Sequence, residues 1–190
     1  LDPHQPRLST SLSIEVTAAG EISNWKIQNS VIRSQKALSY HDADLALKNF
    51  DSPWHTILFV LDKIATALRR KRENAGAITI EQDELSVKVQ LPEEVSVTVV
   101  KRSSPSRRLV AEFMILCNSL LAEFCREARL PAIYRTQPTP RVLITPPKSE
   151  GPLERFLITQ QLQSTKLDTV ASRHSGLGLP SYIQASSPLR

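Results

Sequence analysis

Three residues at the end of the chain have the types and spacing to hold a phosphate group. The pair Ser187-Pro188 is typical of a helix start, because serine is a preferred N-cap and proline fits the first helical turn. A helix N-terminus attracts anions, and Arg190 in that first turn adds a guanidinium that can bind two phosphate oxygens. These residues taken alone also allow Arg190 to be an exposed arginine at the cut end of a fragment.

A second candidate is Glu112, a carboxylate within the largely apolar run 107–130. A carboxylate among apolar side chains is costly unless it is paired or used. Arg108 lies four residues earlier, so an ion pair along one helix face is the structural alternative. Glu112, Ser119 and Glu123 share a narrow polar stripe of this run. The spacing alone leaves both interpretations of Glu112 open.

Other kinds of active site find little support in the residue pattern. Cys117 falls on the apolar face of the same run and is expected to pack in the core. The acidic groups 42–44 and 81–84 have the residue types of metal ligands, but such groups are common on solvated turns. The histidines share no spacing with a serine or carboxylate that forms a catalytic triad; they are His4, His41, His55 and His174.

Composition favours a polyanionic partner only weakly. The 190 residues carry a net charge of +5, with a pI near 9.4. The basic run 69–72 either ends a helix and faces water or contacts an RNA backbone, and the sequence does not separate these two. Cys117 and Cys125 lie too far apart along one helix for a disulfide, which fits a reduced, intracellular setting. No run is apolar and long enough to span a membrane, and no segment resembles a signal peptide.

An α+β arrangement must position these candidates. The longest helical pattern, 107–130, has N-cap candidates at Ser103, Ser104 and Ser106, and Pro131 is expected to end it. Its first half is apolar almost all round, which predicts a long buried helix with mixed sheet elements packed around it. The other predicted elements are a hairpin over 11–32 that turns at Gly20, a short helix capped by Asp42 or Asp44, a helix over 54–74 that ends at Gly76, strands over 77–80, 85–91, 95–101, 132–135 and 174–179, and a helix over 152–163.

Three stretches of the sequence resemble motifs of a known family. They are LVAEFMILCN, then LPAIYRTQP, and HSGLGLPSYIQASSPLR at the end of the chain. In this order they resemble motifs of the ribonuclease II/R (RNB-domain) exoribonuclease family, and they are most similar to its cyanobacterial and plastid members. The resemblance extends over most of the chain. It implies that residues 1–190 are the C-terminal portion of an RNB catalytic domain, truncated at both ends.

The resemblance implies a function for the longer protein. Family members are hydrolytic, Mg²⁺-dependent exoribonucleases that degrade single-stranded RNA from the 3′ end to nucleoside 5′-monophosphates. Their metal-binding aspartates are expected upstream of Leu1, so residues 1–190 alone should be inactive. The alternative is a non-catalytic RNA-binding or scaffold relative that lacks those aspartates. A cytoplasmic location is expected, with the chloroplast stroma as the alternative, and nothing in the sequence indicates a membrane or a protein partner.

The resemblance also assigns roles to individual residues. Arg190 matches the arginine that contacts the scissile phosphate and is the expected catalytic residue, with Ser187 beside it as an RNA contact. Tyr40 and Glu112 match residues that contact the ribose near the cleaved end. Ile80 stands where the family has an aromatic ring that stacks on a base, so only an aliphatic contact is expected there.

Overall fold

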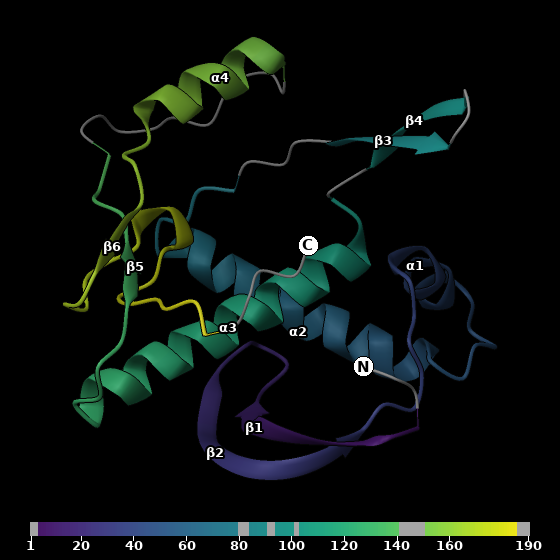
Figure 1. Cartoon of the computed structure of the whole chain (residues 1–190), viewed down its shortest axis with the longest axis horizontal. Coiled ribbons are helices and arrows are strands. Elements are labelled where there is room, and N and C mark those ends of the chain that lie inside the picture. The colour runs from purple at the N-terminus through teal and green to yellow at the C-terminus, as the bar shows by residue number, and fades with distance from the viewer. Residues whose placement is uncertain (1–3, 80–83, 91–93, 101–102, 141–150, 186–190) are drawn as a thin grey trace. The chain divides into compact units, whose positions relative to one another are not determined.

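The structure is a computed structural model that describes residues 4–79, 84–90, 94–100, 103–140 and 151–185 (Figure 1). The chain forms two compact units. The first comprises Leu1–Leu68 and Glu81–Phe113, and the second comprises Arg69–Ile80 and Met114–Arg190. The helices α2 (His55–Asn74) and α3 (Pro105–Glu127) continue from one unit into the other along the sequence. Among the described residues, no helix is both long and apolar enough to cross a membrane.

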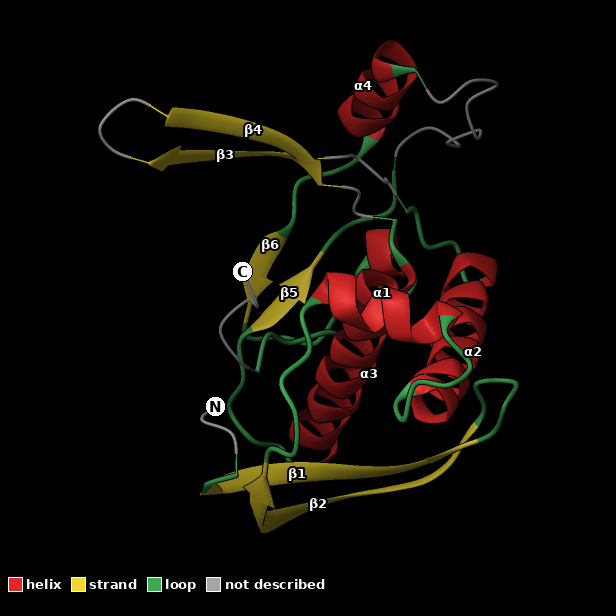
Figure 2. Ribbon diagram, turned by 90° about the vertical axis from the view of Figure 1, so that its right-hand side faces the viewer, coloured by secondary structure: helices red, strands yellow, loops and turns green. Residues whose placement is uncertain are grey.

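The first unit begins with the hairpin that the alternating pattern predicts. β1 (Pro6–Val16) pairs antiparallel with β2 (Ile22–Arg33), as Figure 2 shows. Gly20 in the turn has a φ of 80°, a conformation that glycine adopts without steric cost. A Cβ atom at this position would lie 3.2 Å from the backbone nitrogen of Leu68, so the turn packs directly on α2.

Helix α1 (Tyr40–Lys48) is capped by Ser39, and the predicted cap at Asp42 or Asp44 is wrong. The Asp42 backbone N–H donates to Ser39 Oγ at 3.1 Å, and the Ser39 backbone N–H donates to the Asp42 carboxylate at 3.4 Å. Asp42 is therefore the third helical residue of a capping box. The hydrogen bonds from Ser39 also lower the pKa of Asp42.

A second hairpin of the first unit carries an exposed apolar face. β3 (Glu84–Gln90) pairs antiparallel with β4 (Glu94–Val100), which confirms the predicted pair of strands. Residues directly opposite one another point to the same face of a sheet. Three such pairs are apolar, and each of their side chains is more than half exposed among the described residues: Leu85 with Val99, Val87 with Val97, and Val89 with Val95.

Helix α3 is confirmed, but it ends earlier than the sequence predicts. The Leu130 backbone N–H donates to the Cys125 carbonyl at 2.8 Å, while Arg129 takes the left-handed conformation with a φ of 54°. This Schellman turn ends the helix before Pro131. The most buried residues of α3 are Ser106, Glu112, Leu116, Asn118, Leu120 and Ala122.

The second unit is built around a small sheet and a small core. The predicted strand over 132–135 forms β5 (Tyr134–Thr136), which pairs antiparallel with β6 (Lys166–Asp168). The predicted helix over 152–163 is confirmed as α4 (Pro152–Gln161). The core of this unit contains Ala122, Tyr134 and Ile183. Together with the hairpins of the first unit, these elements confirm the α+β class.

The predicted strand over 174–179 is wrong. Ser175–Leu177 forms a short 3-10 helix, η1, and Gly178 follows with a φ of 66°. A positive φ breaks the extended path of a strand, and the chain turns back so that the His174 N–H donates to the Leu179 carbonyl at 3.0 Å. Residues 77–79, also predicted as strand, belong to none, although the Ile78 N–H donates to the Gly176 carbonyl at 3.0 Å.

We expect the variant Gly178→Ala to destabilise the protein by about 2–4 kcal/mol. The left-handed backbone is strained for alanine, and the added Cβ would lie 2.5 Å from the Arg72 carbonyl oxygen and 3.0 Å from the Ala77 nitrogen. Gly76 is the matched control, because it ends α2 at a φ of 91° with its nearest neighbour, Arg173 Nη2, 3.9 Å away. Urea unfolding should show a much smaller loss for Gly76→Ala, and equal losses would contradict the role given to the close approach.

Candidate functional site

Two of the five residues assigned to the site by sequence lie in the described part of the chain. Tyr40 and Glu112 belong to the first unit, on α1 and α3. Ile80, Ser187 and Arg190 lie outside the described residues. Their assignments stay predictions.

Tyr40 is the first residue of α1 and is held against the start of α3. Its ring is 39% exposed, and the Arg107 guanidinium lies 4.3 Å from the ring centre in a cation–π contact. Ser106 Oγ donates to the Tyr40 carbonyl at 3.0 Å, and the Ser106 backbone N–H donates to Asp44 Oδ1 at 2.9 Å. These contacts fix the phenol relative to the first turn of α3.

Glu112 lies five residues after Arg107, about 7.5 Å further along the axis of α3. Only 5% of Glu112 is exposed. Arg108, the partner that helical spacing suggests for it, donates from Nη2 to Asp62 Oδ1 of α2 at 2.7 Å. A carboxylate accepts hydrogen bonds and a phenol both donates and accepts them. The structure thus brings the two predicted ribose contacts to the same end of α3.

Asn118 is a buried polar residue that the sequence reasoning passes over. Its side chain is in the second unit, and 5% of the residue is exposed. Asn118 Nδ2 donates to the Tyr182 hydroxyl at 3.0 Å, and Asn118 Oδ1 accepts from the Ala185 backbone N–H at 3.3 Å. The signal that could have found it is an amide at the end of LVAEFMILCN, where the surrounding positions are apolar.

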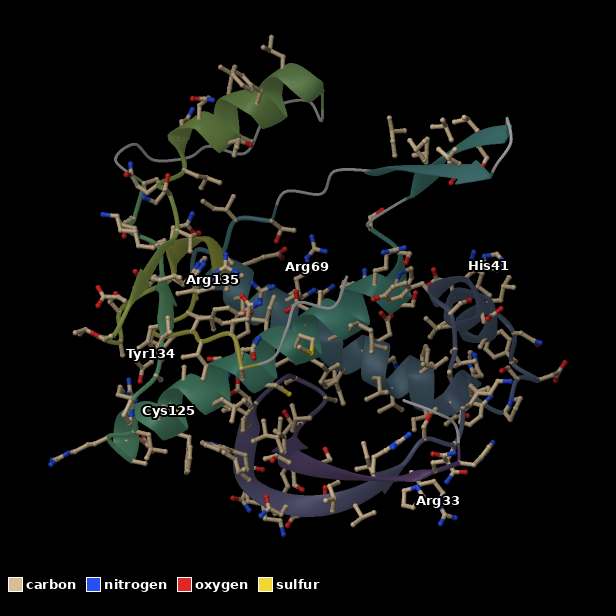
Figure 3. All side chains as sticks on the ribbon, in the orientation of Figure 1. Arg33, His41, Arg69, Cys125, Tyr134 and Arg135 are labelled. Atoms are coloured by element: carbon tan, nitrogen blue, oxygen red, sulfur yellow. The ribbon has the colours of Figure 1, made fainter. Side chains whose placement is uncertain are left out.

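His174 and Arg135 support the same segment from other directions. The rings of His174 and Tyr182 meet edge to face, with centres 5.8 Å apart. Burial, and then the positive charge of Arg135, lowers the pKa of His174, so its ring is neutral near pH 7. The Arg135 backbone N–H donates to the Tyr182 carbonyl at 2.8 Å, and Arg135 Nη1 donates to Gln184 Oε1 at 3.2 Å. Figure 3 shows Arg135 beside Tyr134 on β5.

The basic run 69–72 serves the second unit in at least two positions. Arg69 forms an ion pair with Glu73 at 2.8 Å, one helical turn away. Arg72 Nη1 donates to the Leu177 carbonyl at 3.1 Å, and the Arg72 carbonyl accepts from the Ala77 N–H at 2.9 Å. Arg69 and Arg72 therefore have structural roles, which neither of the two sequence interpretations includes.

The described residues do not form a metal site. Among them, no group of three or more His, Cys, Asp and Glu side chains is arranged to hold a metal ion. Asp42 completes the cap of α1 and Asp44 accepts from Ser106, while most of 81–84 lies outside the described residues. Burial raises the pKa of the Cys117 thiol, which keeps it protonated and unreactive near pH 7.

Comparison with known sequences gives consistent matches. The family model described as RNB domain matches residues 1–145. An uncharacterized ribonuclease of Synechocystis sp., sll1290, is 32% identical over 96% of this chain and 28% of its own length. The chloroplastic/mitochondrial ribonuclease II of Arabidopsis thaliana is 28% identical over 96% of this chain and 23% of its own length. The chain therefore spans about a quarter of the length of the curated relatives it matches.

Comparison with solved structures identifies the fold. RNase R of Mycoplasma genitalium, in complex with ribose methylated single-stranded RNA, aligns with a TM-score of 0.80 and 16% identity over 98% of this chain and 35% of that chain. Yeast Ssd1, a pseudonuclease, aligns with a TM-score of 0.65 and 14% identity over 96% of this chain and 27% of that chain. The same fold thus occurs in an RNase R and in a pseudonuclease.

Proposed function

Since the chain belongs to the RNB-domain family, we propose that the protein it is part of hydrolyses single-stranded RNA from the 3′ end and releases nucleoside 5′-monophosphates. The observation that carries this proposal is the match of the RNB domain model to residues 1–145. The 32% identity to a protein named as a ribonuclease, over 96% of this chain, supports it. The activity is proposed for the whole protein, because the chain spans only part of its relatives.

Mg²⁺ is the proposed cofactor. When bound, it would stabilise the attacking and leaving oxygens of phosphoryl transfer. The described residues offer no cluster that fits the ion, so none of them is proposed as a ligand. The ligands are expected in a part of the protein that precedes Leu1.

Tyr40 and Glu112 are proposed to select RNA through the ribose. A 2′-hydroxyl is both a donor and an acceptor, and DNA lacks it. The Glu112 carboxylate can accept its hydrogen and the Tyr40 hydroxyl can donate to its oxygen. The contact of Arg107 with the Tyr40 ring and the burial of Glu112 support this proposal, because a held group loses less conformational entropy on binding.

Arg190 and Ser187 are proposed to hold the scissile phosphate. The helix start at Ser187-Pro188 would present backbone N–H groups to the phosphate, and Arg190 would add two parallel hydrogen bonds. The positive charge would offset the negative charge that develops on the phosphate in the transition state. Ile80 is proposed to make an aliphatic contact with a base.

The second candidate function is RNA binding without hydrolysis. The similarity of the fold to a pseudonuclease favours keeping it, because the fold alone does not require activity. A scaffold of this kind would bind the same RNA and leave its length unchanged. For either function we propose the cytoplasm, with the chloroplast stroma as the alternative that the name of the Arabidopsis relative supports.

The proposal predicts that the whole protein shortens RNA and spares DNA. The test uses end-labelled single-stranded RNA and DNA of one sequence, with Mg²⁺ or with a chelator. RNA should shorten only with Mg²⁺, and DNA should be cut at least about 10-fold more slowly, since one or two hydrogen bonds to the 2′-hydroxyl are lost. RNA that is bound but never shortened would reject the enzyme and leave the binding function.

A further inference from the structure

We propose that Asn118 is a positioning residue that sets where Arg190 lies against the RNA phosphate. This inference rests on the proposed function, because it takes Arg190 as the phosphate contact. Its structural basis is the segment 182–185, where the described part of the chain ends. In the sequence this segment continues directly to Ser187 and Arg190.

Asn118 binds both ends of the segment 182–185 with a single amide group. Its Nδ2 donates to the Tyr182 hydroxyl at 3.0 Å, and its Oδ1 accepts from the Ala185 backbone N–H at 3.3 Å. A backbone N–H can only donate, so the amide oxygen must face Ala185 and the nitrogen must face Tyr182. Because Asn118 is 5% exposed and lies on a long helix, this amide is a fixed support.

The other described contacts of the segment lie before Ala185. The Tyr182 ring packs edge-on against His174, and Arg135 binds the Tyr182 carbonyl and the Gln184 side chain. Ile183 forms a β-bridge with Tyr134 and belongs to the core. Among the described residues, the bond from Ala185 to Asn118 is therefore the last anchor before the segment that carries Arg190.

This anchor restricts the space that Arg190 can reach. Five residues separate Arg190 from Ala185, a distance of at most about 17 Å along an extended chain. A displaced guanidinium loses the two-bond geometry on phosphate, and a misplacement of about 1 Å can cost on the order of 10²-fold in rate. Ala185 is exposed, so water can replace Asn118 as its partner. The loss of Asn118 should therefore loosen the segment without unfolding the unit.

The experiment compares variants of the whole protein with similar packing. Asn118→Leu keeps the side-chain volume and removes both hydrogen bonds, whereas Tyr182→Phe removes only the bond to Nδ2. Leu120→Ala is the control for stability, because Leu120 is also 5% exposed on α3 and its removal leaves a cavity. The readouts are the single-turnover rate of RNA hydrolysis, the RNA Kd and the melting temperature.

We expect Asn118→Leu to slow hydrolysis about 10- to 100-fold while the Kd changes less than about 3-fold, because the reacting phosphate and not the bulk of the RNA is misplaced. Tyr182→Phe should cost only about 2- to 5-fold, since the bond to Ala185 remains. Leu120→Ala should lower the melting temperature and leave the rate of the folded protein unchanged. A rate for Asn118→Leu within about 3-fold of wild type would overturn the proposal.

A double variant separates positioning of Arg190 from a general structural effect. In the Arg190→Ala background, Asn118→Leu should add less than about 2-fold, because the group it positions is gone. Losses that multiply would show that Asn118 acts independently of Arg190 and would reject the inference. If Arg190→Ala itself hydrolyses RNA at the wild-type rate, it is the proposed role of Arg190 that fails.

Discussion

Replacement of Arg190 by alanine in the whole protein should slow single-turnover RNA hydrolysis about 10²- to 10³-fold, the usual cost of losing one donor to a developing negative charge. RNA binding should stay near normal, because the rest of the bound strand keeps its contacts. Arg190→Lys should not restore the rate, since an ammonium group lacks the planar fork that binds two phosphate oxygens.

The control for this prediction is the loss of an unrelated positive charge. Arg33 is an exposed arginine at the end of β2 and has no assigned role, so Arg33→Ala should leave the rate of bound RNA unchanged. A shift in Kd for both variants would report long-range electrostatics, which depends on salt. Hydrolysis at the wild-type rate by either Arg190 variant would remove this residue from the mechanism.

The combined variant Tyr40→Phe with Glu112→Ala should narrow the preference for RNA over DNA about 10- to 100-fold. Each group is proposed to bind the 2′-hydroxyl, and each hydrogen bond is worth roughly 1 kcal/mol or more in a buried site. Tyr40→Phe keeps the ring that contacts Arg107, so the start of α3 should stay in place. The measurement is the ratio of the cleavage rates of RNA and DNA by the same preparation, in which the folded fraction cancels.

Glu123 provides the matched control for Glu112. It is a carboxylate on the same helix and on the same predicted stripe, but it is half-buried and has no assigned role. Glu123→Ala should leave the RNA/DNA ratio at the wild-type value. An unchanged ratio in the folded Tyr40→Phe, Glu112→Ala protein would show that neither residue senses the sugar.

The long elements could be predicted because their signals are local. The alternation of β1 and β2 and the apolar period of α3 each span ten or more residues, so a single misplaced residue does not hide them. Helix caps were harder, since Ser39, Asp42 and Asp44 are all good caps and the geometry alone decides among them. The segment 174–179 alternates like a strand, but Gly178 has a positive φ that alternation does not reveal.

The candidate site was predictable only where the resemblance named its residues. The bonds from Asn118 to Tyr182 and Ala185 join positions more than 60 residues apart, and no local pattern contains such a pair. The same holds for Arg108, whose expected helical partner was Glu112 and whose observed partner is Asp62 of α2. Arg72 looked like one cation of a basic run, yet its guanidinium binds the Leu177 carbonyl. Long-range contacts of this kind depend on the fold.

The most direct test of the central claim is the identity of the product that the whole protein releases from RNA. Single-stranded RNA labelled at its 5′ end or throughout is incubated with the protein and Mg²⁺, and the products are separated by chromatography. The account predicts nucleoside 5′-monophosphates from the first time point, with the 5′ label retained on progressively shorter RNA, and no release by residues 1–190 alone. Internal fragments, nucleoside 3′-monophosphates, or bound RNA of unchanged length would contradict it.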